Sequence, residues 1–192
     1  MLKIVTVPNK VLSSPTKQVS EIDEKIKKFI FEMEETLAAQ TDPQGVGLAA
    51  NQVGVDLSIF IIKKSPTTDT RVFINPKILK IQNPSSAHAT VGKPKSKGKA
   101  KKLKKAPVKL EGCLSIPRIW GPVKRAPKIL LEYQDLSSTT SGVVRRWFHG
   151  LEATIIQHEM DHLQGVVFTQ RSVEQDAPLY KEKDGELKAI EI

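Results

Sequence analysis

Apolar residues recur at helical spacing near the start of the chain. Six of them follow the 3.6-residue period of an α-helix, with Glu and Lys between them: Ile22, Ile26, Phe29, Ile30, Met33 and Leu37. Ser20 and Asp23 resemble a helix-start signature, and the dipeptide at 42–43, Asp-Pro, favours a stop. The pattern therefore predicts one amphipathic N-terminal helix.

Short apolar and β-branched runs predict a sheet. They lie at residues 2–7, Leu57–Ile62, Arg71–Ile74, Lys128–Tyr133 and Val143–Phe148, and Val166–Phe168 is interpreted as a last strand. Asn75-Pro76 is expected to stop the third run. Because strands outnumber helices and do not alternate regularly with them, we expect an α+β fold with mainly antiparallel strands.

A second helix is predicted from Leu151 to Leu163, ended by Gly165. Its residues are apolar nearly all round, so we expect a central buried helix with the strands packed around it. The helix carries the sequence His-Glu-Met-Asp-His at 158–162. Two imidazoles four residues apart share one helix face and can bind one metal ion, while the intervening Glu159 can reach a water on that ion.

A catalytic metal site needs a third protein ligand. The single cysteine, Cys113, lies in the sequence Glu-Gly-Cys-Leu-Ser at 111–115. One thiolate with two imidazoles leaves a fourth position open, as catalytic sites require. A lone cysteine is more commonly an inert buried thiol, and a short H-E-x-x-H match also arises by chance. Sequence spacing alone leaves these alternatives open.

Composition changes the picture in two ways. A length of 192 residues suits one domain, and no apolar run approaches the ~20 residues that cross a bilayer. The N-terminus has no signal-peptide pattern and one cysteine cannot form an internal disulfide, so we expect a cytoplasmic protein with no membrane partner. The net charge of +9 comes from nine lysines within 83–110, since the remaining 21 basic residues match the 21 acidic ones.

The lysine-rich tract at about 83–109 is of low complexity, rich also in Pro, Ala, Ser and Gly. It has too little apolar surface to offset the entropy of ordering, so we expect a disordered insertion. The predicted organisation is a single catalytic domain at 1–170, interrupted by this insertion, and a mixed-charge tail at 171–192.

Three segments together resemble the peptide deformylase family. Residues 45–52 match G-x-G-L-A-A-x-Q, residues 111–115 match E-G-C-L-S, and residues 157–165 match Q-H-E-x-D-H-L-x-G, in the family's order with every fixed position intact. The resemblance covers about residues 1–170. It implies removal of the formyl group from the initiator methionine of nascent N-formyl-methionyl polypeptides.

The resemblance also implies roles for individual residues. Cys113, His158 and His162 would hold one divalent metal ion, Fe(II) by preference, with Ni(II), Co(II) or Zn(II) able to occupy the site. A metal lowers the pKa of its bound water, which would attack the formyl carbon with Glu159 as general base and then general acid. Gln52 and the Leu114 N–H would stabilise the developing oxyanion.

Peptide-binding residues follow from the same resemblance. Backbone hydrogen bonds to the peptide would come from Val46, Gly47 and Gly112. The methionine pocket would be lined by Val46 with Leu151, Thr154 and Ile155. Asp161 would pair with a cation to fix the helix, and Arg125 is the candidate. Trp120 is a candidate for the wall of the outer cleft.

The long segment between Lys77 and Leu110 departs from the family pattern. A tolerated surface insertion is the simplest interpretation. A second interpretation is contact with ribosomal RNA through the lysines, without recognition of a specific nucleic-acid sequence. Two other functions share some of these features. An H-E-x-x-H endopeptidase usually has His or Glu as its third ligand, and a non-catalytic RNA-binding scaffold does not account for three intact motifs.

Overall fold

The computed structural model describes residues 1–42, 44–65, 67–82, 109–136 and 142–190. Its strands form a five-stranded sheet in the order β1-β2-β3-β6-β7 and a four-stranded sheet in the order β4-β5-β8-β9. The first sheet comprises β1 Gly47–Ala49, β2 Ile59–Ile62, β3 Arg71–Gln82, β6 Lys128–Gln134 and β7 Val143–His149. The second comprises β4 Leu110–Cys113, β5 Ile116–Pro122, β8 Leu179–Lys183 and β9 Glu186–Ile190.

The described helices are α1 Glu24–Ala38, α2 Gly150–Leu163 and α3 Phe168–Glu174, with short 3-10 turns η1 Lys10–Ser13 and η2 Ala50–Val53. Every pairing between neighbouring strands of the two sheets is antiparallel. The predicted α+β class with mainly antiparallel strands is therefore confirmed.

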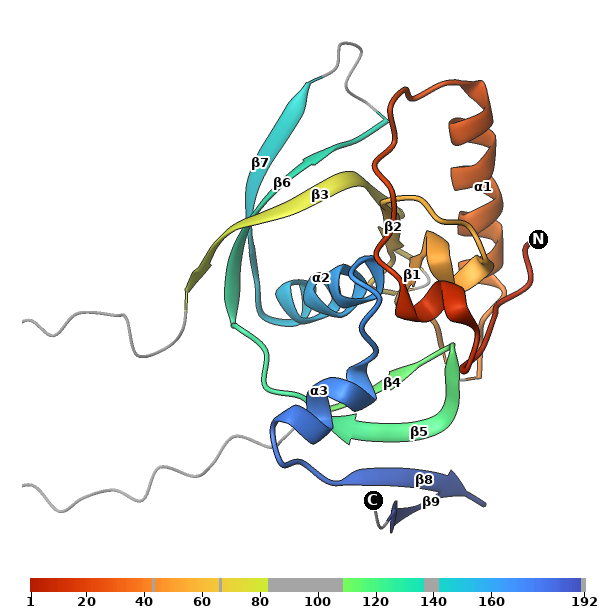
Figure 1. Cartoon of the computed structure of the whole chain (residues 1–192), viewed down its shortest axis with the longest axis vertical. Coiled ribbons are helices and arrows are strands. Elements are labelled where there is room, and N and C mark those ends of the chain that lie inside the picture. The colour runs from red at the N-terminus through yellow and green to blue at the C-terminus, as the bar shows by residue number, and fades with distance from the viewer. Residues whose placement is uncertain (43, 66, 83–108, 137–141, 191–192) are drawn as a thin grey trace, which may run out of the picture.

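Helix α2 lies between the two sheets (Figure 1). The larger sheet covers it through an aromatic cluster, in which Phe60 stacks on Phe73 at 4.6 Å between ring centroids and Phe148 meets Phe73 edge-on. Ile155 and Ile156 of α2 belong to the same buried cluster. Burial of these large apolar side chains is the main force that holds α2 in place.

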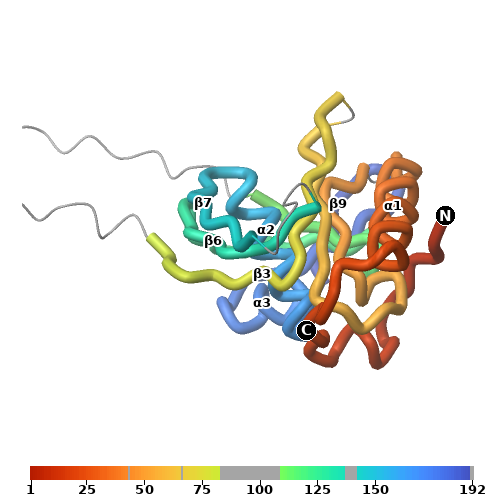
Figure 2. The backbone as a smooth tube through the Cα atoms, turned by 90° about the horizontal axis from the view of Figure 1, so that it is seen from above, coloured from red at the N-terminus to blue at the C-terminus, as the bar shows by residue number. Residues whose placement is uncertain are grey.

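Helix α1 lies at the opposite end of the molecule from β6 and β7 (Figure 2). It begins three residues later than the Ser20 signal predicts, because the Asp23 side chain accepts the Ile26 N–H at 2.9 Å and caps the first turn. Its buried residues Ile30, Met33 and Leu37 pack with residues of β1 and β2. The amphipathic pattern thus predicts the correct buried face.

Three predictions about strands were wrong. Strand β3 continues through Asn75-Pro76 to Gln82, because a register shift between Ile74 and Lys77 places the proline where the ladder to β6 is already interrupted. Residues 2–7 form no strand, although the N–H groups of Val5 and Val7 donate to backbone oxygens of Gln52 and Ser115.

The third error is at Val166–Phe168, where α3 begins with Val167 as its N-cap. A three-residue apolar run does not distinguish a strand from a buried helix start, and Phe168 is 1% exposed. The pairing of β8 with β5 and β9 was not predicted either, because the sequence of β8 is mostly charged and gives no strand pattern.

The lysine-rich tract falls almost wholly at 83–108, outside the described residues, so its predicted disorder stays a prediction. The division at residue 170 also stays a prediction. Among the described helices, none combines the length and apolar character that crossing a bilayer requires.

Candidate metal centre

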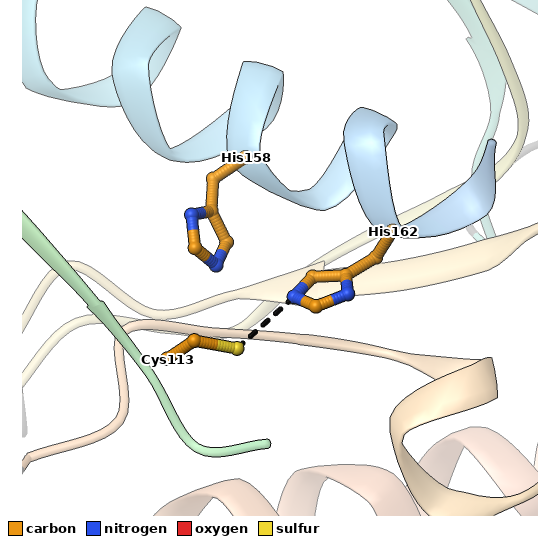
Figure 3. Close-up of side chains that lie close together, drawn as sticks. All are labelled: Cys113, His158 and His162. Carbon is orange, nitrogen blue, oxygen red and sulfur yellow. Dashed lines mark hydrogen bonds between the residues drawn. The ribbon is translucent and has the colours of Figure 1, made fainter. Parts of the chain in front are cut away.

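Two histidines and one cysteine converge on a single point (Figure 3). His158 and His162 project from α2 toward Cys113 at the end of β4, and their candidate ligand atoms lie within 4.8 Å of one another. The Cys113 Sγ lies 3.2 Å from the His162 Nε2. Cys113 and His162 are buried, at 7% and 1% exposure. Strand β4 supplies one sulfur and helix α2 supplies two imidazole nitrogens, and this set of donor atoms fits a divalent transition metal.

The Cys113 thiol is poised to ionise. Burial raises its pKa, but the imidazoles of His162 and His158 outweigh that effect and hold the pKa well below its usual range. The thiolate is the form that binds metals. The lowered pKa of Cys113 therefore favours the thiolate that a metal ion at this site would need.

A chain of charged groups fixes the orientation of His158. Its Nδ1 lies 3.0 Å from the Glu111 carboxylate, and Arg125 donates two bonds of 2.9 Å to that carboxylate and one of 2.5 Å to Asp161. Arg171 also bonds Asp161. Burial opposes the ionisation of Glu111, but bonds from Arg125 and His158 lower its pKa to about 2.

Sequence reasoning paired Arg125 with Asp161 and missed the roles of Glu111 and Arg171. Glu111 could have been found, because it stands two residues before the candidate ligand Cys113, and the second ring N–H of an imidazole ligand commonly donates a hydrogen bond to a carboxylate. Arg171 carried no signal, since it lies outside the three motifs.

The C-terminal end of α2 is held by η2 and by the N-terminal segment. Asn51 donates to the His162 carbonyl at 2.5 Å, and Thr16 N–H donates to the Leu163 carbonyl at 2.9 Å. Gly165 adopts φ +73°, and a Cβ there would lie 2.6 Å from the Ser14 backbone nitrogen. Only glycine satisfies both the left-handed turn and this close approach, which sets the end of the helix directly after the second histidine.

Glu159 is buried beside the two histidines, at 3% exposure, and its Oε2 has no partner among the described residues. Burial raises its pKa to about 7, although His158 and His162 counteract the shift. A Cβ on Gly47 would overlap the Glu159 carboxylate. Glycine at 47 therefore leaves the space that this carboxylate occupies.

Gln52 is oriented by hydrogen bonds on both sides of its amide. Its Oε1 accepts the Ala49 N–H at 2.8 Å, and its Nε2 donates to Cys113 Sγ and Ser115 Oγ at 3.3 Å each. The side chain is 2% exposed. The donor end of the amide consequently faces the metal-ligand group.

A cavity of about 290 Å³ opens onto this group. It is lined by Gln52, Cys113, Leu114, His158 and Glu159, together with all six predicted peptide-binding residues: Val46, Gly47, Gly112, Leu151, Thr154 and Ile155. Trp120 lines it as well, and so do Gln44, Gly45, Lys109, Leu110 and Glu111, which were not predicted to line it. His162, Arg125 and Asp161 are not part of this lining.

Comparisons with known proteins agree with this geometry. The polypeptide deformylase family matches residues 1–177. The chain is 34% identical to a peptide deformylase of Dictyoglomus turgidum, over 95% of this chain and 99% of that protein. It is 36% identical to peptide deformylase 1 of Bacillus anthracis, over 89% and 92%.

Solved structures are similar too. The crystal structure of a Thermotoga maritima peptide deformylase has a TM-score of 0.67 and 31% identity, over 89% of this chain and 97% of that one. A Synechococcus elongatus peptide deformylase, crystallised in complex with actinonin, has a TM-score of 0.68 and 32% identity, over 88% and 78%. The chain belongs to the polypeptide deformylase family, whose members are metal-dependent hydrolases.

Proposed function

We propose that this chain hydrolyses the formyl group from the initiator methionine of nascent polypeptides, and that Cys113, His158 and His162 hold the metal ion that the reaction needs. When bound, a divalent cation there would acidify water and polarise the formyl oxygen. The observation that carries the proposal is the buried Glu159. Its Oε2 has no partner among the described residues, and its side chain lines one cavity with Cys113, His158 and Gln52.

Proton transfer is assigned to Glu159. Its carboxylate takes a proton from the attacking water as the water oxygen bonds to the formyl carbon. It then delivers that proton to the amine nitrogen as the carbon–nitrogen bond breaks, so that formate and a free N-terminus leave. Burial raises the pKa of this carboxyl group above its ordinary value, which favours the stage at which Glu159 holds the proton.

Two hydrogen-bond donors are assigned the role of stabilising the negative charge that develops on the formyl oxygen. The Gln52 amide already points its Nε2 toward Cys113, and the Leu114 backbone N–H follows that residue directly. Fixed donors of this kind typically lower a barrier by about 3–4 kcal/mol each. The apolar side chains of Leu151 and Ile155 would hold the methionine side chain in the same cavity.

Iron(II) is the metal we propose, with nickel, cobalt or zinc able to replace it. We also propose that the enzyme is cytoplasmic. A thiolate with two imidazoles suits any of these borderline ions. Anaerobic purification followed by elemental analysis tests the choice. About one iron per chain is expected, whereas stoichiometric zinc without iron would contradict it.

The reaction is tested by measuring formate released from formyl-Met-Ala-Ser by anaerobic, metal-loaded protein. The control substrate is an unformylated peptide, in which internal cleavage would indicate an endopeptidase. Formate release with no internal cleavage is expected. A folded, metal-loaded chain that releases no formate is not an active deformylase.

A further inference from the structure

The Trp120 indole forms one wall of the cavity. Trp120 on β5 is the register partner of Gly112 on β4, and both residues line the cavity. A Cβ on Gly112 would lie 2.7 Å from the indole ring, so the ring lies directly over the backbone of β4. Any peptide that runs along Gly112 away from Cys113 must therefore pass the face or edge of this ring.

The ring is fixed by a residue of the C-terminal hairpin. The indole N–H, its only hydrogen-bond donor, bonds the Glu182 Oε2 at 2.8 Å. Glu182 lies on β8, which pairs with β5 at Trp120 and Tyr180, and its side chain is 23% exposed. Glycine below and a carboxylate at the edge leave the ring little freedom to rotate.

The same carboxylate is also linked, through Arg118, to a residue that precedes the cavity-lining segment 44–47. Its Oε1 accepts from Arg118 at 2.9 Å, and the other guanidinium nitrogen of Arg118 bonds Asp42, also at 2.9 Å. Asp42 precedes the segment 44–47, which lines the cavity. Glu182 thus bonds the Trp120 wall directly and, through Arg118, is linked to Asp42 beside the segment 44–47.

We propose that Glu182 is a positioning residue that holds Trp120 against the part of the peptide that follows the formyl-methionine. This inference rests on the proposed function. The metal-ligand group fixes where the formyl carbon must sit, and the α2 side chains Leu151 and Ile155 occupy the methionine end. Trp120 and Leu110, which belong to the four-stranded sheet, are left to contact the peptide residues that follow the methionine. Their apolar surface selects apolar side chains at those peptide positions.

Kinetics with two substrates test the proposal in the intact, metal-loaded enzyme. Formyl-Met-Leu-Phe reaches the wall, whereas formyl-methionine ends before it. Glu182→Ala is expected to raise the KM for the tripeptide by about 3- to 10-fold, the range that one aromatic contact supplies, with kcat and the KM for formyl-methionine unchanged. Glu182→Gln keeps an acceptor for the indole N–H and should restore most of the wild-type KM.

Glu186→Ala is the matched control, because this exposed glutamate of the same hairpin pairs only with Lys188 in the described part of the chain. It should leave both KM values unchanged. Equal KM changes for the two substrates in Glu182→Ala, or none for the tripeptide, would overturn the proposal.

Fluorescence gives a readout independent of turnover. In Trp147→Phe protein, Trp120 is the sole tryptophan. Adding Glu182→Ala should then increase acrylamide quenching of its emission, because the freed ring reaches solvent more. Unchanged quenching contradicts the positioning role. If the wild type releases no formate from either substrate, the proposed function fails, and quenching alone still decides whether Glu182 holds Trp120.

Discussion

At the scale of single residues, the site depends on how closely groups approach. The Glu159 carboxylate lies where a side chain on Gly47 would be, and the Gln52 amide is aimed by the Ala49 N–H. Glutamate and glutamine are common residues, so neither Glu159 nor Gln52 is unusual in itself. Both require a particular neighbour, which is why substitutions beside the reactive groups test the account well.

Gly47→Ala should lower kcat by about 100-fold or more, the usual contribution of a positioned general base, because the new methyl group displaces the Glu159 carboxylate. Steady-state kinetics and thermal melting measure the two effects separately. Gly150→Ala is the control: it has φ +56° and open space around its Cβ position, so it should cost about 1 kcal/mol of stability without loss of kcat. A Gly47→Ala enzyme with normal kcat contradicts the proposed place of Glu159.

At the scale of elements, the predictions succeeded where periodicity was long and failed where it was short. The α1 pattern covers four turns and predicted the buried face, whereas Val166–Phe168 offered three apolar residues and proved to lead into α3. The strand break expected at Pro76 is absent, because a register shift in β3 accommodates the proline. Local sequence does not show which partner strand will be present to absorb such an irregularity.

The salt bridges that join separate elements also cannot be predicted from local sequence. Arg125, in the link between β5 and β6, bonds Glu111 on β4 and Asp161 on α2, and all three side chains are at most 9% exposed. Buried charges need partners, so this network joins the second sheet to the helix that carries both histidines.

Arg125→Ala should therefore lower the free energy of unfolding by about 3–5 kcal/mol, since it leaves the buried Glu111 carboxylate without its arginine and Asp161 with Arg171 alone. Chemical denaturation of the metal-loaded protein measures this loss. Arg145→Ala removes a bridge to Glu132 whose arginine is 68% exposed, and it should cost less than about 1 kcal/mol. Equal losses in the two variants would mean that the buried network does not support α2.

At the scale of the whole molecule, the site exists only because two sheets meet at α2. Cys113 and His158 are 45 residues apart in sequence, yet β4 delivers the cysteine to the helix. Residue patterns predicted two ligands on one helix face and offered Cys113 as a candidate third, and the family resemblance assigned it that role. The link from Trp120 to Glu182 could not be predicted, because it depends on β8 pairing with β5.

At this scale, the lysines of the lysine-rich tract are proposed to contact ribosomal RNA. Deleting residues 93–105 removes eight lysines. Ribosome co-sedimentation over a salt series should then show weaker binding and a smaller salt dependence, because each lost phosphate contact removes roughly 0.7–0.9 from the log–log slope. Unchanged binding after the deletion would rule out this contact.

The most direct test of the central claim is formate release by wild type and Glu159→Ala, measured anaerobically beside the metal content of each protein. The account predicts that the variant keeps about one metal per chain, since its three ligands are intact, and loses activity by about 100-fold or more. A variant that retains both metal and near-normal turnover would show that another group moves the proton, and the role given to Glu159 would be wrong.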